Sequence, residues 1–109
     1  MSLDEVYEAI DVALENAQPV VVATVAQTRG STPRKTGAKM VIRADGSFVG
    51  TIGGGCGESE VWQEAMEIHE DGQPRMVTVD LTEPIDGEDK ICGGVMRIFL
   101  EHLSQGPID

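Results

Sequence analysis

The run from Val20 to Ala26 is the feature that most constrains the fold of this chain. It reads Val-Val-Val-Ala-Thr-Val-Ala and contains no charged residue. A run of this length, rich in β-branched residues, is typical of a strand that is buried on both faces. It is far shorter than the roughly 20 apolar residues that a membrane-spanning helix requires. The sequence therefore predicts a central strand of a sheet and no membrane span.

Two segments show the three-and-four spacing of apolar residues that is typical of amphipathic helices. The first extends from Leu3 to Ala17, and Pro19 ends it because proline cannot continue a helix. The second extends from Glu58 to Glu70, and Asp71-Gly72 ends it. We predict that both helices pack an apolar face against the sheet.

Four further strands are expected besides the central one. Lys39 to Arg43 and Ser47 to Thr51 flank Asp45-Gly46, a pair that is typical of a tight hairpin turn. Arg75 to Leu81 alternates between polar and apolar residues, as a third strand or an edge element does, and Val95 to Leu100 reads as a closing strand. The five strands and two helices together indicate a sheet with helices packed on it.

These elements predict an α/β (α+β) fold for residues 1–109, a single small domain with a mixed β-sheet of about five strands and two main helices packed on it. A chain of 109 residues is the size of one ordinary domain, so no Rossmann-like second domain is expected. Thr28 to Gly37 is predicted to be a polar loop, Thr82 to Lys90 an acidic loop, and residues 104–109 a frayed tail.

The charge of the chain excludes some partners and draws attention to one segment. A formal net charge of −11 would repel a phosphate backbone, so binding to DNA or RNA is not expected. The acidic N-terminus lacks the basic-then-apolar order of a secretory signal, which predicts a cytoplasmic protein. Five of the eight basic residues lie within fifteen positions, either as a solvated basic loop or as part of a ligand site. They are Arg29, Arg34, Lys35, Lys39 and Arg43.

The glycine-rich segment from Gly50 to Glu58 is the first candidate site. Each glycine from Gly53 to Gly55 costs roughly 0.5–1 kcal/mol relative to alanine, so we expect special backbone angles or a close approach there. Between a strand and a helix, free N–H groups and the helix dipole favour an anion such as phosphate. The alternative is a tightly packed corner. Neither GxxxxGK[ST] nor a complete GxGxxG is present, which argues against those two nucleotide sites.

Cys56 and Cys92 both adjoin glycines, in Gly55-Cys56-Gly57 and Cys92-Gly93-Gly94. Cys56 lies at the start of the second helix, where the dipole favours a thiolate that acts as nucleophile or soft ligand. The alternative for each cysteine is a small buried residue.

Other candidate residues have ordinary structural interpretations beside the functional ones. Glu58 either caps the helix or serves as an acid, a base or an orienting group. Trp62 and Met66 are expected in the core or in an oligomer contact. No zinc site is expected, because there is no CxxC pair and neither His69 nor His102 has ligand spacing to a cysteine. Both histidines are expected to be surface or interface residues.

Several motifs, taken in order, resemble those of the N-terminal domain of the XdhC/CoxI family. The resemblance spans nearly the whole chain, and the linked motifs make it more specific than any one glycine cluster. They are Gly30-Ser31-Thr32-Pro33-Arg34, Gly37-Ala38-Lys39-Met40, Asp45-Gly46, Gly50-Thr51-Ile52-Gly53-Gly54-Gly55-Cys56, Glu58, Cys92-Gly93-Gly94 and Glu101.

The resemblance implies an accessory factor for molybdenum hydroxylases such as xanthine dehydrogenase and carbon monoxide dehydrogenase. Such a factor binds the molybdenum cofactor as cargo, as molybdopterin or its dinucleotide form, supports its sulfuration and helps to insert it into the apo-enzyme. This implies a cofactor chaperone rather than an enzyme. The implied partners are the apo-enzyme and either a separately encoded Rossmann-domain relative or a second copy of the chain. The alternatives are a non-catalytic docking or assembly module and a cysteine-dependent sulfur-transfer enzyme.

The phosphate of this cargo requires anion donors, and its soft metal is suited to a thiol. We expect the amides of Gly53 to Gly55, with Arg34 and Lys39, to hold the phosphate. Cys56 or Cys92 is expected near the metal or the sulfur in transit, and no other catalytic residue is predicted. The candidate cofactor-binding residues are Ser31, Arg34, Lys39, Gly53, Gly54, Gly55, Cys56, Glu58, Cys92, Gly93 and Gly94.

Overall fold

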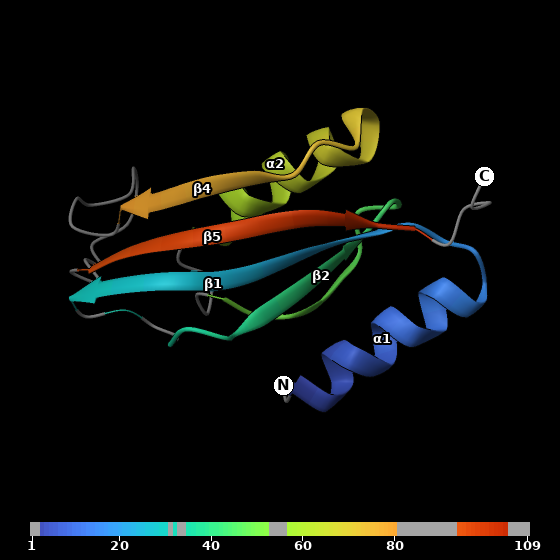
Figure 1. The fold of residues 1–109 in the computed structure, drawn as a ribbon, viewed down its shortest axis with the longest axis horizontal. Helices are drawn as coiled ribbons and strands as arrows, with labels where there is room; N and C mark the ends of the chain where they lie inside the picture. The colour runs from blue at the N-terminus through green and yellow to red at the C-terminus, as the bar shows by residue number, and fades with distance from the viewer. Residues whose placement is uncertain (1–2, 31, 33–34, 53–56, 81–93, 105–109) are drawn as a thin grey trace.

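A computed structural model describes residues 3–30, 32, 35–52, 57–80 and 94–104 of the chain. It consists of one five-stranded sheet with a helix on each side (Figure 1). In chain order the elements are α1 (Leu3–Glu15), β1 (Val20–Gly30), β2 (Lys39–Arg43), β3 (Phe48–Gly50), α2 (Glu58–Asp71), β4 (Arg75–Asp80) and β5 (Gly94–Leu103).

The strands lie in the order β3-β2-β1-β5-β4, and every neighbouring pair is antiparallel. The predicted α+β fold with two helices is therefore confirmed, but the expected mixed sheet is fully antiparallel. The connection through α2 carries the chain from β3 at one edge to β4 at the other. These two strands run in the same direction, yet three strands separate them, so the five described strands form no parallel pair.

Strand β1 is the central strand, as the run from Val20 to Ala26 predicts. Its side chains alternate between the two faces, with Val21 and Ala23 in the core beneath α2 and Val20 and Val22 in the core beneath α1. All four side chains are buried. The interior on both sides of the sheet is thus built on this one strand.

The prediction that a loop begins at Thr28 is wrong, because β1 continues to Gly30. Residues 28–30 pair with residues 94–96 of β5, which begins at Gly94 and extends to Leu103. The local composition of residues 28–30 indicates a loop, but backbone hydrogen bonds with a distant strand hold these residues in the sheet. The predicted acidic loop from Thr82 to Lys90 and residues 105–109 of the predicted tail lie outside the described residues.

Two separate cores hold the helices to the sheet. Helix α2 packs on β1, β2, β4 and β5, and α1 packs on β2 and β3. The α2 core includes Val61, Ala65 and Ile68 from the helix, with the half-buried Trp62 and Met66 packed against it. This confirms the expected core position of those two residues. Within the described part of the chain, neither helix is long and apolar enough to cross a membrane.

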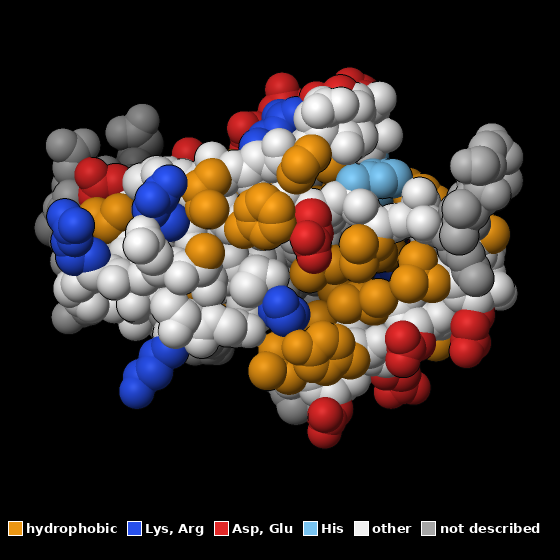
Figure 2. Space-filling model, in the orientation of Figure 1, with side chains coloured by type: hydrophobic (Ala, Val, Ile, Leu, Met, Phe, Trp, Pro, Cys, Tyr) orange, Lys and Arg blue, Asp and Glu red, His pale blue; other side chains and the backbone are white. Residues whose placement is uncertain are grey.

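The sheet face opposite α2 is covered along only part of its length. Residues Ala26–Gly30 of β1 are exposed. Figure 2 shows this face, with Lys and Arg side chains over its left half, where β1 ends and β5 begins, and hydrophobic side chains beside α1. The described structure therefore leaves the far half of this face open to a ligand or a partner.

Glycines in the left-handed region lie at both ends of α2. Gly57 precedes the helix with φ of 76° and Gly72 follows it with φ of 71°. At Gly57 an added Cβ would lie 2.5 Å from Cγ1 of Val79, whereas nothing lies within 4 Å at Gly72. The start of α2 is therefore pressed against the end of β4, and the end of α2 is not confined in this way.

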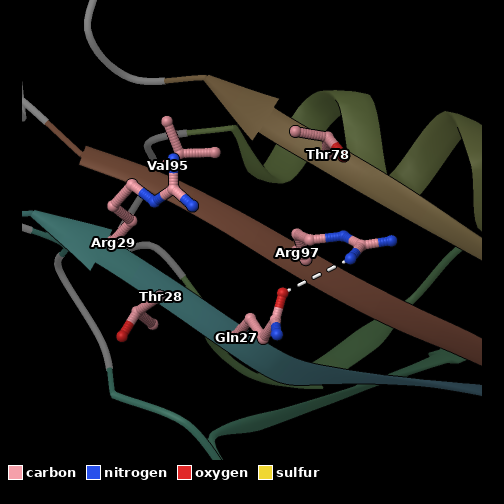
Figure 3. Close-up of a pocket in the computed structure, with 6 residues that line it drawn as sticks. All are labelled: Gln27, Thr28, Arg29, Thr78, Val95 and Arg97. Atoms are coloured by element: carbon pink, nitrogen blue, oxygen red, sulfur yellow. Dashed lines mark hydrogen bonds between the residues drawn. The ribbon is translucent and has the colours of Figure 1, made fainter.

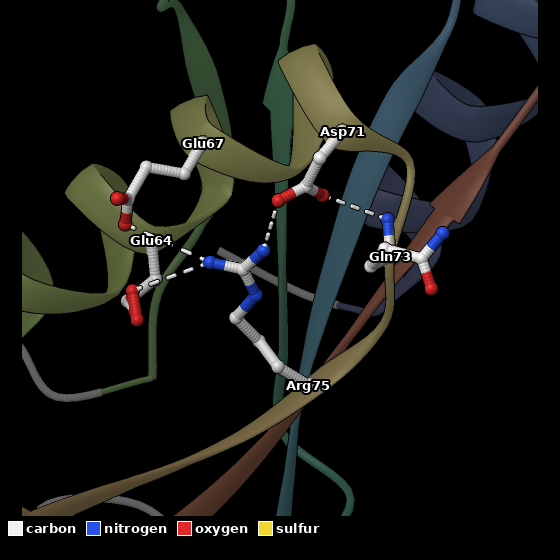
Figure 4. Close-up of polar contacts among 5 residues, drawn as sticks. All are labelled: Glu64, Glu67, Asp71, Gln73 and Arg75. Atoms are coloured by element: carbon white, nitrogen blue, oxygen red, sulfur yellow. Dashed lines mark hydrogen bonds and ion pairs between the residues drawn. The ribbon is translucent and has the colours of Figure 1, made fainter.

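A charged cluster joins the end of α2 to the start of β4 (Figure 4). The Arg75 guanidinium lies 2.5 Å from Asp71 and 3.6 Å from both Glu64 and Glu67. The pKa of the Glu67 carboxyl is raised, first by its hydrogen bond with Glu64 and then by the charge of Glu64. The pKa of Asp71 is lowered, chiefly because the backbone N–H of Gln73 donates to its carboxylate. Three carboxylates surround one guanidinium, so ionised Glu67 is repelled by the charge of Glu64.

We predict that Gly57→Ala is considerably more destabilising than Gly72→Ala, although both glycines have nearly the same φ. Each alanine costs about 1–2 kcal/mol for the left-handed conformation, and the clash with Val79 at position 57 adds about 1–3 kcal/mol. Urea unfolding of the two variants measures the difference. A double variant with Val79→Ala should recover part of the loss at position 57, and equal losses in the two single variants would contradict the packing described here.

Glu67→Gln should raise the midpoint of urea unfolding at pH 7. A raised carboxyl pKa means that the folded state holds the proton more tightly, so the stability from Glu67 is present below its ordinary pKa and lost as pH rises. The gain from Glu67→Gln should therefore shrink at about pH 3.5, where the wild-type carboxyl is itself protonated. Glu70→Gln, an exposed carboxyl on the same helix, is the control. A gain that is the same at both pH values would contradict the repulsion.

Candidate functional site

Several described ends of the predicted site segments meet at one end of the sheet. Gly30, the last residue of β1, pairs with Gly94, the first residue of β5. Asp80, the last residue of β4, pairs with Val95. The segments that follow β1, follow β4 and precede β5 therefore start or finish at neighbouring points, although they are far apart in the sequence.

The glycine-rich segment enters α2 at the same end. Gly57 lies against Val79, the residue before the last position of β4. The fold thus brings Gly57 close to the strands that carry Gly30 and Gly94. Most predicted site residues themselves lie outside the described part of the chain. These are Ser31, Arg34, Gly53, Gly54, Gly55, Cys56, Cys92 and Gly93.

Glu58, the first residue of α2, is bonded to the start of the glycine-rich segment. Its Oε2 accepts a short hydrogen bond from the hydroxyl of Thr51 and a second bond, of 3.2 Å, from the backbone N–H of Ile52. Ile52 is fully buried in the α2 core. One carboxylate therefore connects the residues on either side of Gly53 to Cys56, and its place in the first helical turn is also favoured by the helix dipole.

Lys39 lies on the opposite face of the sheet from Glu58. Its Nζ donates a hydrogen bond of 2.9 Å to the hydroxyl of Thr24, and it shares a face with Val41, which belongs to the α1 core. The structure therefore does not bring Lys39 and Glu58 together. The charge of Lys39 belongs to the face that α2 leaves open.

A hollow of about 310 Å³ lies on this open face, between the ends of β1, β4 and β5 (Figure 3). Two arginines line it, and Nη1 of Arg97 donates to Oε1 of Gln27 at 3.3 Å. Among the residues that the structure describes, neither Arg29 nor Arg97 forms an ion pair. The lining residues are Gln27, Thr28, Arg29, Thr78, Val95 and Arg97.

Sequence reasoning noted Arg29 within the basic segment but missed Arg97 and Gln27. The available signal was alternation, because Arg97 stands between Met96 and Ile98, which are both fully buried. A polar residue between two buried strand residues must point to the other face. The alternation along β5 places Arg97 on the open face, but it does not predict that Arg29 lies on the neighbouring strand.

His69 is not a simple surface residue, contrary to one of the two expectations for it. Its ring is half-buried, Nε2 lies 3.0 Å from the carbonyl oxygen of Ile42, and Nδ1 is buried without a partner among the described residues. The ring of His102 meets it edge to face, with centroids 5.7 Å apart. No cluster of three or more potential metal ligands occurs within the described ranges.

Comparison with known proteins relates this architecture to a family. A model of the XdhC and CoxI family matches residues 13–80. The Uncharacterized protein YqeB of Escherichia coli K12 is 40% identical over 85 residues, which are 75% of this chain and 15% of that protein. A probable xanthine dehydrogenase subunit of Bacillus subtilis 168 is 29% identical over 99 residues, 88% of this chain and 30% of that protein.

Two further matches agree with these. The Molybdenum cofactor insertion chaperone PaoD of Escherichia coli K12 is 33% identical over 91 residues, 84% of this chain and 29% of that protein. The crystal structure of a xanthine dehydrogenase from Bacillus halodurans superposes with a TM-score of 0.75 at 33% identity and covers 87% of this chain and 29% of that one. This chain spans 15–30% of the length of the three curated relatives. Because the family model matches more than half of its residues, the chain belongs to the XdhC and CoxI family.

Proposed function

We propose that this chain binds the molybdenum cofactor as cargo and assists its insertion into a molybdenum hydroxylase. One relative is named as a molybdenum cofactor insertion chaperone and another as part of a probable xanthine dehydrogenase. The structural observation that carries the proposal is that Gly30 pairs with Gly94 at one end of the sheet and that Gly57 lies against Val79 near the same end. The segments with the candidate anion donors and both cysteines adjoin that end.

The residues of these segments suit the chemistry of the cargo. In the proposal, the amides of Gly53 to Gly55, together with Arg34, hold the anionic part of the cofactor, and Ser31 is a further candidate. Lys39, which we expected to take part, is left out because it lies on the face of the sheet opposite Glu58. Cys56 and Cys92 supply thiols suited to the soft metal or to sulfur in transit. Glu58 acts as a positioning residue, since it is bonded to Thr51 and Ile52 ahead of the glycines.

The proposal predicts that the purified chain, alone or with a partner domain, retains molybdenum and pterin on gel filtration after incubation with released cofactor. Metal analysis and pterin fluorescence measure the two components, and activation of apo-enzyme measures handover. Absence of binding under both conditions would contradict it. Protection of the glycine-rich amides from hydrogen exchange by the partner protein, but not by the cofactor, would favour the docking or assembly module instead.

Glu58→Ala tests the positioning role. This change removes the acceptor for the buried N–H of Ile52 and should lower the free energy of unfolding by about 1–3 kcal/mol. We also expect several-fold weaker retention of cofactor at a temperature where the variant is still folded. Glu60→Ala is the matched control, because Glu60 is an exposed acid in the same first turn of α2. Equal effects of the two variants on cofactor retention would show that Glu58 acts only through helix charge.

Support for sulfuration is the second part of the proposal, and Cys56 is the candidate carrier. Helix α2 begins two residues after Cys56, and a helix N-terminus stabilises a thiolate. The thiolate would attack the outer sulfur of a donor persulfide, form the Cys56 persulfide and release the donor thiolate. Mass spectrometry should show an adduct of roughly 32 Da, one sulfur atom, that Cys56→Ser abolishes and Cys92→Ser retains. If a competent donor produces no adduct, Cys56 is not a sulfur carrier, and the chain only binds the cofactor.

A further inference from the structure

A β-bulge in β1 places two polar side chains on the open face of the sheet. The pairing of β1 with β5 shifts between Val25 and Gln27, so that Gln27 lies opposite Arg97 and Arg29 opposite Val95. Without the extra residue, strict alternation from Val25 would turn Gln27 and Arg29 toward the α2 face. Bulges are often found where a side chain must be re-aimed beside a site.

The two arginines that meet there are not neutralised by the described carboxylates. The contrast within the same domain is Arg75, which three carboxylates surround. Asp80 shares a row of the ladder with Val95 and Arg29, and it lies two strands from Arg29, roughly 10 Å away. It is a diagonal neighbour of Arg97 on the adjacent strand, at roughly 7–8 Å, but the two form no ion pair. Glu101 is four residues from Arg97 along β5, roughly 13 Å away. A chain with a net charge of −11 therefore places two arginines on one open face of the sheet, and no described carboxylate pairs with either of them.

The hollow between them has the donors that an oxyanion requires. Gln27 holds one N–H of Arg97, which leaves the remaining donors of that guanidinium for a ligand. Figure 3 shows Arg29 and Arg97 rising from neighbouring strands on the same side of the sheet. Guanidinium groups bind phosphate oxygens in a bidentate manner, and the hydroxyl of Thr78 adds a further donor to the lining. A space of about 310 Å³ admits a phosphate or pyrophosphate with part of the group it carries.

We propose that this hollow is a binding site for the phosphate or pyrophosphate group of an organic phosphate, held by Arg29 and Arg97. The identification of that ligand as the molybdenum cofactor rests on the function proposed above, whereas anion binding does not. Arg29 directly precedes Gly30, where β1 reaches the end of the sheet that the predicted site segments adjoin. The open face thus supplies an anion subsite built from described residues of β1 and β5.

Titration with inorganic pyrophosphate by isothermal calorimetry, at physiological ionic strength, tests the anion site directly. We expect one ion per chain, with Arg97→Gln and Arg29→Gln each weakening binding about tenfold or more. Arg97→Lys keeps the charge but loses the planar fork, so it should give an intermediate affinity. Arg43→Gln is the matched control, because it removes the same charge from a side chain that hydrogen-bonds Ser47 beside the hairpin turn. Circular dichroism and urea unfolding verify that each variant is folded.

The outcomes separate this inference from the proposed function. Absence of pyrophosphate binding, or equal weakening by Arg43→Gln and Arg97→Gln, would overturn the anion site. If the arginine variants bind pyrophosphate weakly but retain the molybdenum cofactor fully, the site takes another organic phosphate and the assignment of the cargo to it is wrong. If wild-type chain binds pyrophosphate but never the cofactor, the proposed function fails and the anion site stands.

Discussion

The pairing of β1 with β5 is the interaction on which the rest of the structure depends. The ladder extends from Val20 opposite Leu103 to Gly30 opposite Gly94, and joins segments separated by most of the chain. Because β5 pairs with one side of β1 and β2 with the other, β1 is the central strand. It also places the end of β1 beside the start of β5. Without this ladder Gly30 and Gly94, the described ends of two predicted site segments, would not be neighbours.

The two helices cover the two faces of the sheet to different extents. The face beneath α2 forms most of the core, and part of the other face remains exposed. Helix α2 contacts four strands, and its core contains most of the large buried side chains. Helix α1 covers the side of β2 and β3, so the far parts of β1 and β5 remain open. On the open side the bulge before Gln27 brings amide and guanidinium groups together. A stable core on one face therefore allows the other to hold charged groups without a partner from the described carboxylates.

The two sides of the candidate region have different chemical characters. On the α2 side, Glu58 accepts hydrogen bonds from Thr51 and Ile52, the two residues that precede Gly53. On the open side, Lys39, Arg29 and Arg97 concentrate positive charge in an acidic domain. A cargo with an anionic group and a soft metal matches this combination of donors and thiols. The cargo proposed above for this chain has both of these chemical characters.

The sequence by itself determined the local elements, because their periodicity is set by neighbouring residues. The run from Val20 to Ala26 predicted the central strand, Asp45-Gly46 predicted the hairpin, and the apolar spacing after Glu58 predicted α2. The family motifs likewise identified the family. Only the tertiary structure decided that residues 28–30 extend β1, that Lys39 and Glu58 lie on opposite faces, and that Arg97 stands beside Gln27. The extension of β1 and the place of Arg97 depend on the register of a strand some seventy positions away, and the faces of Lys39 and Glu58 depend on how the sheet and α2 pack, neither of which local spacing encodes.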